Sequence, residues 1–236
     1  MKSKSTSEPQ VIFEDNHLLV IHKPSGWLVQ GDKTGDATLT DWGRKYIKEK
    51  YDKPGEVYLH PVHRLDRPVS GIVTFARTSK ASERLNRLFR EDKVVKSYLA
   101  VVQGVPIETE GKLIHWLVKD GSKNLVKAYN RERNGAKRAE LSYEILLVEK
   151  GHSLLHVKPK TGRPHQIRVQ LASMRCPIVG DLRYGKGTPN PDKSISLHAF
   201  QLSFVHPVRK EPLQLTCAPK GQNWSAFENK IDELDQ

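Results

Sequence analysis

Short runs rich in β-branched and aromatic residues recur along this chain of 236 residues, and they constrain its fold more than any other feature. Such runs are typical of β-strands. The predicted strands cover residues 17–23, 72–76, 96–104, 141–148, 153–157 and 200–204. These strands outnumber the predicted helices and do not alternate strictly with them. The pattern therefore favours an α+β domain over a doubly wound parallel sheet.

Apolar residues at helical spacing predict three helices. The first covers residues 38–50, and the second follows Ser79, the predicted N-cap. The third lies along residues 167–174. Residues 149–152 separate two predicted strands, which indicates a hairpin.

The length allows one domain that buries roughly 70% of its unfolded surface, so neither a metal nor a disulfide is needed for stability. Cys176 and Cys217 are isolated, and His60 and His63 lack a companion Cys or His pair. No metal site is therefore predicted. Neither a G-x-x-x-x-G-K-[ST] loop nor a G-x-G-x-x-G turn is present, so no nucleotide cofactor is predicted.

The two ends of the chain are polar. Residues 1–10 are predicted to form a disordered tail, and they do not resemble a secretory signal. Residues 228–236 form an acidic C-terminal tail, which leaves residues 11–227 as the folded domain. No apolar run of about 18 residues indicates a membrane span. We expect a cytoplasmic protein.

The charge balance favours a nucleic-acid partner. Lys and Arg number 39 against 27 Asp and Glu, which gives a net charge of +12. Basic residues crowd residues 123–138 and 158–175. A solvated basic surface is the ordinary alternative, but this clustering favours RNA binding. Residues 120–137 are polar and basic, and they are predicted to form a mobile loop that contacts RNA.

One short segment concentrates candidate chemistry. It runs His63-Arg64-Leu65-Asp66-Arg67-Pro68-Val69-Ser70-Gly71 and leads into the strand predicted at residues 72–76. A carboxylate flanked by arginines stays ionised near neutral pH and can act as a nucleophile. The alternative is that Asp66 only pairs with a neighbouring arginine and braces the loop. The segment alone leaves both readings open.

Further segments follow in a characteristic order. Residues 96–104 contain Tyr98, residues 160–171 contain Arg168, and residues 176–185 include Gly180-Asp181. Together with the opening segment at residues 15–26 and with His-Arg-Leu-Asp, they resemble the RluA class of RNA pseudouridine synthases. The resemblance extends from Val11 to His206-Pro207.

The resemblance implies a fold and an activity. The fold is α+β, with a curved, mixed, mainly antiparallel sheet in two halves, flanking helices and a central active-site cleft. The activity is the isomerisation of uridine in RNA to pseudouridine, without a cofactor, by a monomer. The family members it resembles have a single catalytic domain, and no N-terminal S4-type RNA-binding domain is expected before Val11.

The resemblance also implies roles for individual residues. Asp66 is the catalytic aspartate, Tyr98 packs against the target base, and Arg168 is buried in a pair with the aspartate. Arg64 helps to displace the base from the RNA stack. The remaining candidate substrate-binding residues are Arg67, Arg163, His165 and Gln166. The last two either hydrogen-bond RNA or brace the turn, whereas Asp181 is expected to form a structural cap or turn.

Some alternatives stay open. Asp66 attacks either C1′ of the ribose or the uracil ring, and the substrate is either tRNA or large-subunit rRNA. Val69 stands where the family usually has Thr, and Phe75-Ala76-Arg77 replaces a more aliphatic strand end, which affects substrate details. A non-catalytic RNA-binding or ribosome-assembly protein is the second hypothesis. A glycosidase is the third and least favoured hypothesis, because ordinary glycosidases use two catalytic carboxylates and only Asp66 is proposed as one here.

Overall fold

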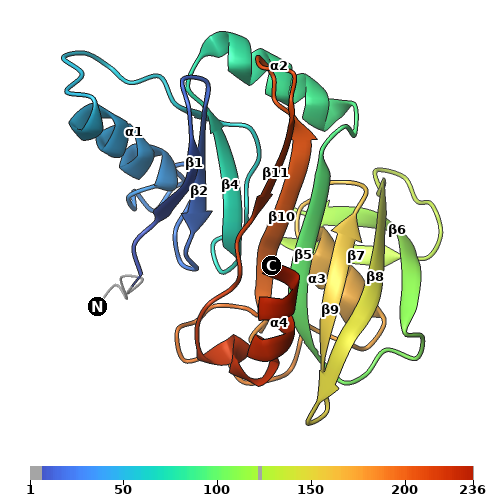
Figure 1. Ribbon diagram of the computed structural model, residues 1–236. Coiled ribbons are helices and arrows are strands. Elements are labelled where there is room, and N and C mark those ends of the chain that lie inside the picture. Colours follow the sequence, from blue (N-terminus) through green and yellow to red (C-terminus); the bar gives the residue numbers. More distant parts are fainter. Residues whose placement is uncertain (1–6, 122–123, 236) are drawn as a thin grey trace. The chain divides into compact units, whose positions relative to one another are not determined.

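A computed structural model describes residues 7–121 and 124–235. The chain divides into two compact units. Unit 1 consists of Met1–Val95 and Gln201–Cys217, and unit 2 consists of Lys96–Phe200 and Ala218–Gln236. The α+β class with a mainly antiparallel sheet is confirmed, since every strand pair with a defined register in either unit is antiparallel. The helices and strands are labelled in Figure 1.

Unit 1 is a sheet with two helices. Its strands are ordered β1-β2-β4-β10, with β3 on β4 and β11 on β10. The elements are β1 (Gln10–Glu14), β2 (Leu18–Lys23), α1 (Leu39–Lys50), β3 (His60–Pro61), β4 (Ser70–Ala76), α2 (Ser79–Arg90), β10 (Leu197–Val205, from Gln201 onward) and β11 (Pro212–Thr216).

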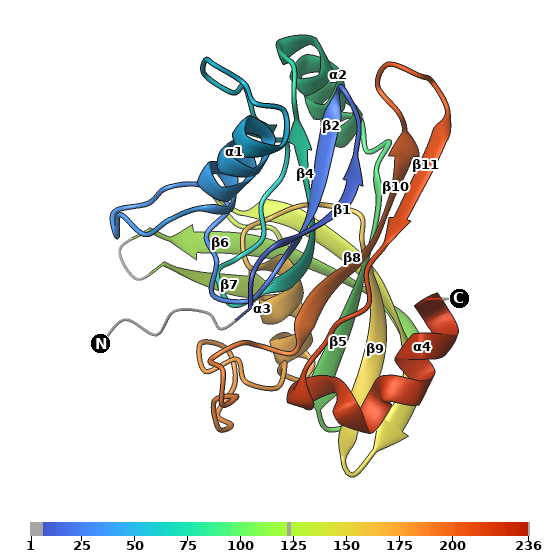
Figure 2. The ribbon, with the colours of Figure 1, turned by 60° about the vertical axis from the view of Figure 1, so that its left-hand side comes forward.

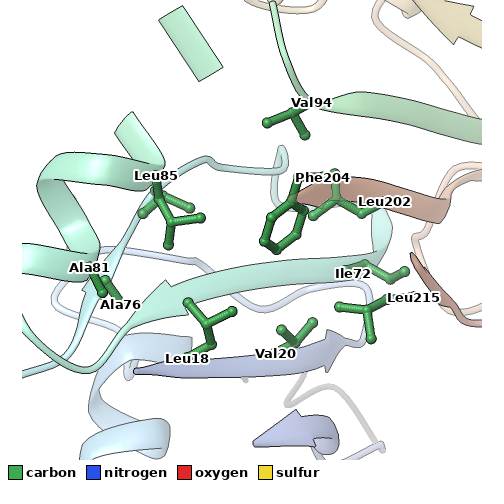
Figure 3. Packing of buried hydrophobic residues seen from close by; sticks show 11 residues of the cluster. Leu18, Val20, Ile72, Ala76, Ala81, Leu85, Val94, Leu202, Phe204 and Leu215 are labelled. Atoms are coloured by element: carbon green, nitrogen blue, oxygen red, sulfur yellow. The ribbon is translucent and has the colours of Figure 1, made fainter. Parts of the chain in front are cut away.

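Strand β2 is buried on both faces, which explains its continuous apolar run. On one face Leu18 and Val20 join the cluster drawn in Figure 3, which also takes in Leu85 from α2. On the other face Ile21 lies under α1. The helix approaches closely because Gly43 has no side chain: a Cβ there would lie 2.6 Å from Leu59 Cδ2.

The N-caps explain where the two helices of unit 1 begin. Thr38 caps α1 in a capping box: its side chain accepts from the Asp41 N–H, and the Asp41 carboxylate accepts from the Thr38 N–H. The helix therefore begins at Leu39, one residue after the predicted start. The predicted N-cap of α2, Ser79, is wrong by one residue. Thr78 has the extended backbone of a cap and accepts a hydrogen bond from the Ala81 N–H at 3.1 Å.

Unit 2 contains the remaining strands of the sheet and also two α-helices. Its strands are ordered β10-β5-β9-β8-β6-β7, with β10 contributing Leu197–Phe200. The other elements are β5 (Val95–Gln103), β6 (Glu110–Asp120), β7 (Leu125–Tyr129), β8 (Lys137–Glu149), β9 (His152–Pro159), α3 (Gln166–Ser173), the 3-10 helix η1 (Gln222–Phe227) and α4 (Glu228–Asp235). The predicted β8–β9 hairpin is confirmed.

The two faces of this sheet carry different helices. Leu99 of β5 and Leu154 of β9 pack with Ile231 of α4 on one face. Val169 of α3 packs with Ala139 of β8 and with residues of β6 and β7 on the other. Figure 2 shows α3 beside β6 and β7. Helix α3 therefore marks the second face of unit 2.

Two segments differ from their predicted form. Residues 120–137 are not simply a loop, because they include strand β7, which pairs with β6 as a hairpin. Val126 is the buried residue of β7, and the next residue, Lys127, is exposed. The acidic segment at residues 228–235 forms α4, and the burial of Ile231 makes it part of the packed core.

The predicted disordered tail covers residues 1–10. Residues 1–6 lie outside the described residues, and Gln10 already belongs to β1. No helix among residues 7–121 and 124–235 is long and apolar enough to cross a membrane.

Candidate active site

Asp66 lies in the loop that joins β3 to β4 in unit 1. The Val69 N–H donates to the Asp66 carbonyl oxygen at 3.0 Å and closes a tight turn. Leu65 and Val69 are buried and anchor the loop, whereas Arg64 is exposed and Asp66 is half-buried. The carboxylate is thus carried by a fixed backbone while solvent still reaches it.

A buried lysine joins this loop to the preceding turn. Lys23 is 0% exposed, and its Nζ donates to the carbonyl oxygens of Pro24 at 3.1 Å, Trp27 at 2.9 Å and Arg67 at 3.2 Å. The Gly26 N–H also donates to the Arg67 carbonyl at 2.8 Å. Gly26 has φ +86°, a conformation that favours glycine. Residues 24–27 therefore clamp the backbone next to Asp66.

The pKa of Lys23 is set by its burial and by two charged neighbours, Asp66 and Arg67. Burial lowers the pKa of Lys23 to about 7, the negative charge of Asp66 opposes this shift, and the positive charge of Arg67 adds to it. Three carbonyl acceptors match the three N–H groups of an ammonium. When protonated, Lys23 is therefore a buried cation whose field acts on the candidate nucleophile.

We expect Lys23→Met to change how stability depends on pH. An unfolded lysine keeps its proton up to about pH 10.5, whereas Lys23 in the folded protein loses it near pH 7. The unfolded state thus binds more protons between these values, so this group makes stability rise with pH, by up to about 1.4 kcal/mol per pH unit. Denaturant unfolding measured from pH 6.5 to 10 should show that the free energy of unfolding rises with pH in the wild type relative to Lys23→Met.

The exposed Lys33 of the same unit provides the control. Lys33→Met should follow the wild-type pH dependence, because it removes an exposed lysine and leaves the buried Lys23 in place. If the wild type and Lys23→Met keep a constant difference in unfolding free energy across this range, then Lys23 does not titrate near neutral pH.

The two predicted arginines of the Asp66 loop differ in their surroundings. Arg67 Nε donates to the Gly26 carbonyl at 3.0 Å, and its Nη1 lies 2.9 Å from Asp36 Oδ2. These bonds brace the loop. Arg64, in contrast, is exposed beside Asp66 in the sequence. Of the two, Arg64 has the surroundings expected of a residue that reaches a substrate.

In unit 2, Arg168 of α3 forms a buried ion pair. Its Nε lies 2.7 Å from Asp181 Oδ2, and its Nη2 donates to Asp181 Oδ1 at 2.9 Å. Arg168 is 5% exposed and Asp181 is 3% exposed. Asp181 Oδ1 also accepts from the Arg183 N–H at 3.1 Å, so the predicted turn is present. Its pairing with Arg168 was not predicted.

Tyr98 lies on the face of unit 2 that carries α3. It is half-buried on β5 and stands opposite Val157 of β9, which in turn stands opposite Tyr143 of β8. Residues directly opposite each other on neighbouring strands lie on the same face of the sheet. Alternate residues of one strand also share a face, so Tyr143 lies on the same face as Ala139, which packs under α3. The structure therefore brings Tyr98 and the Arg168-bearing helix to the same side of this sheet.

Gln166 is a bracing residue. It is buried, and its Oε1 accepts from the Thr161 hydroxyl at 2.7 Å and from the Arg163 N–H at 3.0 Å. Its Nε2 donates to the Glu140 carbonyl at 3.1 Å. This favours the turn-bracing alternative over contact with RNA. Arg163, which is half-buried, donates from Nε to the Arg138 carbonyl at 3.1 Å.

His165 sits at the N-cap of α3 in the left-handed conformation, with φ 52°. Its Nδ1 lies 2.7 Å from the hydroxyl of Tyr184. The Tyr184 ring centroid lies 5.3 Å from Arg168 Cζ, and burial raises the pKa of the Tyr184 phenol. Tyr184, which the sequence did not single out, thus connects two of the predicted site residues.

A serine–histidine–glutamate chain lies on the other face of the sheet. The Ser97 hydroxyl contacts His156 Nε2, and His156 Nδ1 lies 2.7 Å from Glu144 Oε1. Ser97 is 1% exposed, so a substrate cannot reach its hydroxyl. The chain joins β5, β9 and β8 and is structural.

Lys23, Asp181 and Tyr184 are the residues that motif reasoning missed. The sequence contained one sign that Lys23 matters. This lysine ends an apolar strand between His22 and Pro24, and a buried lysine must find hydrogen-bond acceptors. Asp181 and Tyr184 act through contacts with residues distant in the sequence, which no local pattern indicates.

Known proteins resemble this chain over most of its length. A tRNA pseudouridine synthase C of Vibrio parahaemolyticus is 34% identical over 224 residues, covering 87% of this chain and 88% of the relative. A ribosomal large subunit pseudouridine synthase C of Buchnera aphidicola is 35% identical over 204 residues, covering 84% of this chain and 63% of the relative.

The fold is also similar to a solved structure. The human RNA Pseudouridylate Synthase Domain Containing 4 protein superposes with a TM-score of 0.76 at 26% identity, covering 94% of this chain and 92% of that chain. Residues 17–173, which contain Asp66, Tyr98 and Arg168, match the RNA pseudouridylate synthase family. The chain therefore belongs to that family, whose members isomerise uridine to pseudouridine.

Proposed function

We propose that this protein isomerises specific uridines of tRNA or large-subunit rRNA to pseudouridine, with Asp66 as the nucleophile. The observation that carries the proposal is the Asp66 loop, clamped by a fully buried Lys23 within the region that matches the family. A fixed carboxylate next to a buried cation is suited to attack, because little reorganisation is needed when charge shifts.

The proposed reaction breaks the N1–C1′ bond, turns the uracil and joins C5 to C1′. Asp66 attacks either C1′ or the uracil ring and is released when the new bond forms. The proton leaves C5, and N1 gains one, so atoms and charge balance without net oxidation. No redox cofactor is required by this balance.

The resemblance assigns roles to the remaining residues of the proposal. Arg64 displaces the base, which costs a few kcal/mol of stacking, and Tyr98 stacks on the flipped base, which returns roughly 1–3 kcal/mol. Arg168 balances the charge of the aspartate. The half-exposed position of Tyr98 on the α3 face supports its part.

RNA as the substrate is supported by charge and by relatives. The net charge of +12 suits a polyanion. The relatives named above include one that acts on tRNA and one that acts on the large ribosomal subunit. We propose that the protein works in the cytoplasm as a monomer.

Pseudouridine mapping tests the proposal and names the substrate. Total RNA from matched wild-type and deletion strains should differ at one or a few uridines, and the purified protein should restore those sites in RNA from the deletion strain. The proposal fails if the purified protein forms no pseudouridine in unmodified tRNA or rRNA.

A non-catalytic RNA-binding or ribosome-assembly role is the second candidate, because the basic charge supports it equally. A deletion phenotype that an inactive variant repairs would favour it. The clamp on Asp66 argues against it, since binding alone does not need a fixed, half-buried carboxylate.

A further inference from the structure

The loop after α3 holds the outer edge of strand β7. Strand β7 ends the strand order of unit 2. Arg183 Nη1 donates to the Asn124 carbonyl at 2.6 Å, and the Val126 N–H donates to the Tyr184 hydroxyl at 3.0 Å. Asn124 lies in the turn before β7 and has φ 46°, whereas Val126 lies in the strand. Two adjacent side chains of the loop thus bind the backbone where β7 begins.

The same loop also holds Arg168. Asp181, two residues before Arg183, binds the Arg168 guanidinium through both carboxylate oxygens. The ring of Tyr184 packs toward the guanidinium, and its hydroxyl reaches His165 at the start of α3. Residues 181–184 therefore connect the edge of β7 to the arginine side chain on α3.

The Tyr184 hydroxyl also contacts the start of α3. His165, at the N-cap of α3, places its Nδ1 2.7 Å from this hydroxyl. The same hydroxyl accepts from the Val126 N–H. One hydroxyl thus joins the start of α3 to the hairpin.

The β6–β7 hairpin and the turn after it are rich in exposed basic side chains. They are Lys119, Lys127, Arg131, Arg133, Lys137 and Arg138. The Arg133 guanidinium stacks over the Tyr129 ring, with Cζ 4.0 Å from the centroid. This surface suits a phosphate backbone.

We propose that residues 181–184 form a joint through which RNA bound at the β6–β7 hairpin positions Arg168, with Tyr184 as a positioning residue. This inference rests on the proposed function. When RNA holds the hairpin, β7 stays fixed, and Tyr184 and Asp181 hold the guanidinium in one orientation. Substrate binding and the orientation of a catalytic side chain are thereby linked within unit 2.

Tyr184→Phe tests the joint. The phenyl ring keeps its packing near Arg168, while the hydroxyl bonds to Val126 and His165 are lost. We expect the maximal single-turnover rate of pseudouridine formation to fall about tenfold, with the RNA dissociation constant changed by less than about twofold. Hydrogen exchange of the Val126 amide should become faster.

The exposed Arg183 provides a second variant that does not disturb the core. Arg183→Met removes the bond to the Asn124 carbonyl, and we expect the same lowered maximal rate. Lys220 is exposed in unit 2 outside both basic clusters, and Lys220→Met loses the same charge. It should keep the wild-type maximal rate. A purely structural role for the loop would lower the folded fraction without lowering the rate per folded, RNA-bound molecule.

The outcomes separate the two proposals. If both loop variants speed Val126 exchange but keep the maximal rate within about twofold of the wild type, the joint is refuted while the activity stands. If Tyr184→Phe does not fold, Arg183→Met decides alone. If the wild type forms no pseudouridine, the proposed function fails and the joint falls with it.

Discussion

Asp66→Asn is expected to reduce pseudouridine formation at least about a thousandfold, because the amide cannot act as the nucleophile. Affinity for RNA should change little, since the exposed basic residues carry the phosphate contacts. The single-turnover rate on the RNA identified by mapping measures the first effect, and a binding titration at fixed salt measures the second.

Asp92 offers a matched control for this experiment. It is exposed in unit 1 and has φ 53°, a conformation that asparagine tolerates. Asp92→Asn should therefore keep the wild-type rate while making the same change of charge. A folded Asp66→Asn protein that retains most of the wild-type rate would show that Asp66 is not the nucleophile.

Asp181→Asn should be the most destabilising single change discussed for unit 2. It leaves the Arg168 guanidinium, whose side chain is 6% exposed, without its bidentate partner. Breaking a buried ion pair costs roughly 3–5 kcal/mol. Thermal unfolding should show a Tm lowered by about 10 °C, since each kcal/mol shifts Tm by roughly 2–4 °C at this size.

A control and a double variant isolate the charge effect. Asp232 is exposed on α4 of the same unit, and Asp232→Asn should leave Tm nearly unchanged. Replacing both partners, as Arg168→Met with Asp181→Leu, should recover much of the lost stability, because apolar pairs often substitute for buried ions. Activity should stay low in the double variant. Equal Tm values for Asp181→Asn and Asp232→Asn would contradict a stabilising pair.

Part of the secondary structure was predictable from the sequence. The runs at residues 17–23 and 200–204 correspond to the observed β2 and β10, whereas β1, β3, β6, β7 and β11 were not predicted. The cap of α2 was misplaced because Thr78 and Ser79 have equivalent side-chain oxygens, and only the backbone angles distinguish them. Strand β7 was missed because it is only five residues long and lies within a polar, basic stretch.

Only part of the candidate site was predictable in the same way. Asp66, Tyr98 and Arg168 were nominated because their local segments carry a recognisable order of residue types. Arg67 and Gln166 were grouped with the substrate-binding candidates, yet they donate hydrogen bonds to the Gly26 and Glu140 carbonyls. A polar residue in a basic loop gives no local sign of whether it faces RNA or the protein's own backbone.

The sequence by itself determined the α+β class, the positions of six strands and of helices α1 to α3, and the family, because these depend on residue types and on spacing along the chain. Only the tertiary structure decided that Lys23 clamps the Asp66 loop, that Asp181 holds Arg168 and that Tyr184 ties β7 to α3. Each of these contacts joins groups far apart in the chain or buried together. Their energies depend on distance and burial in space, which no order of residues specifies locally.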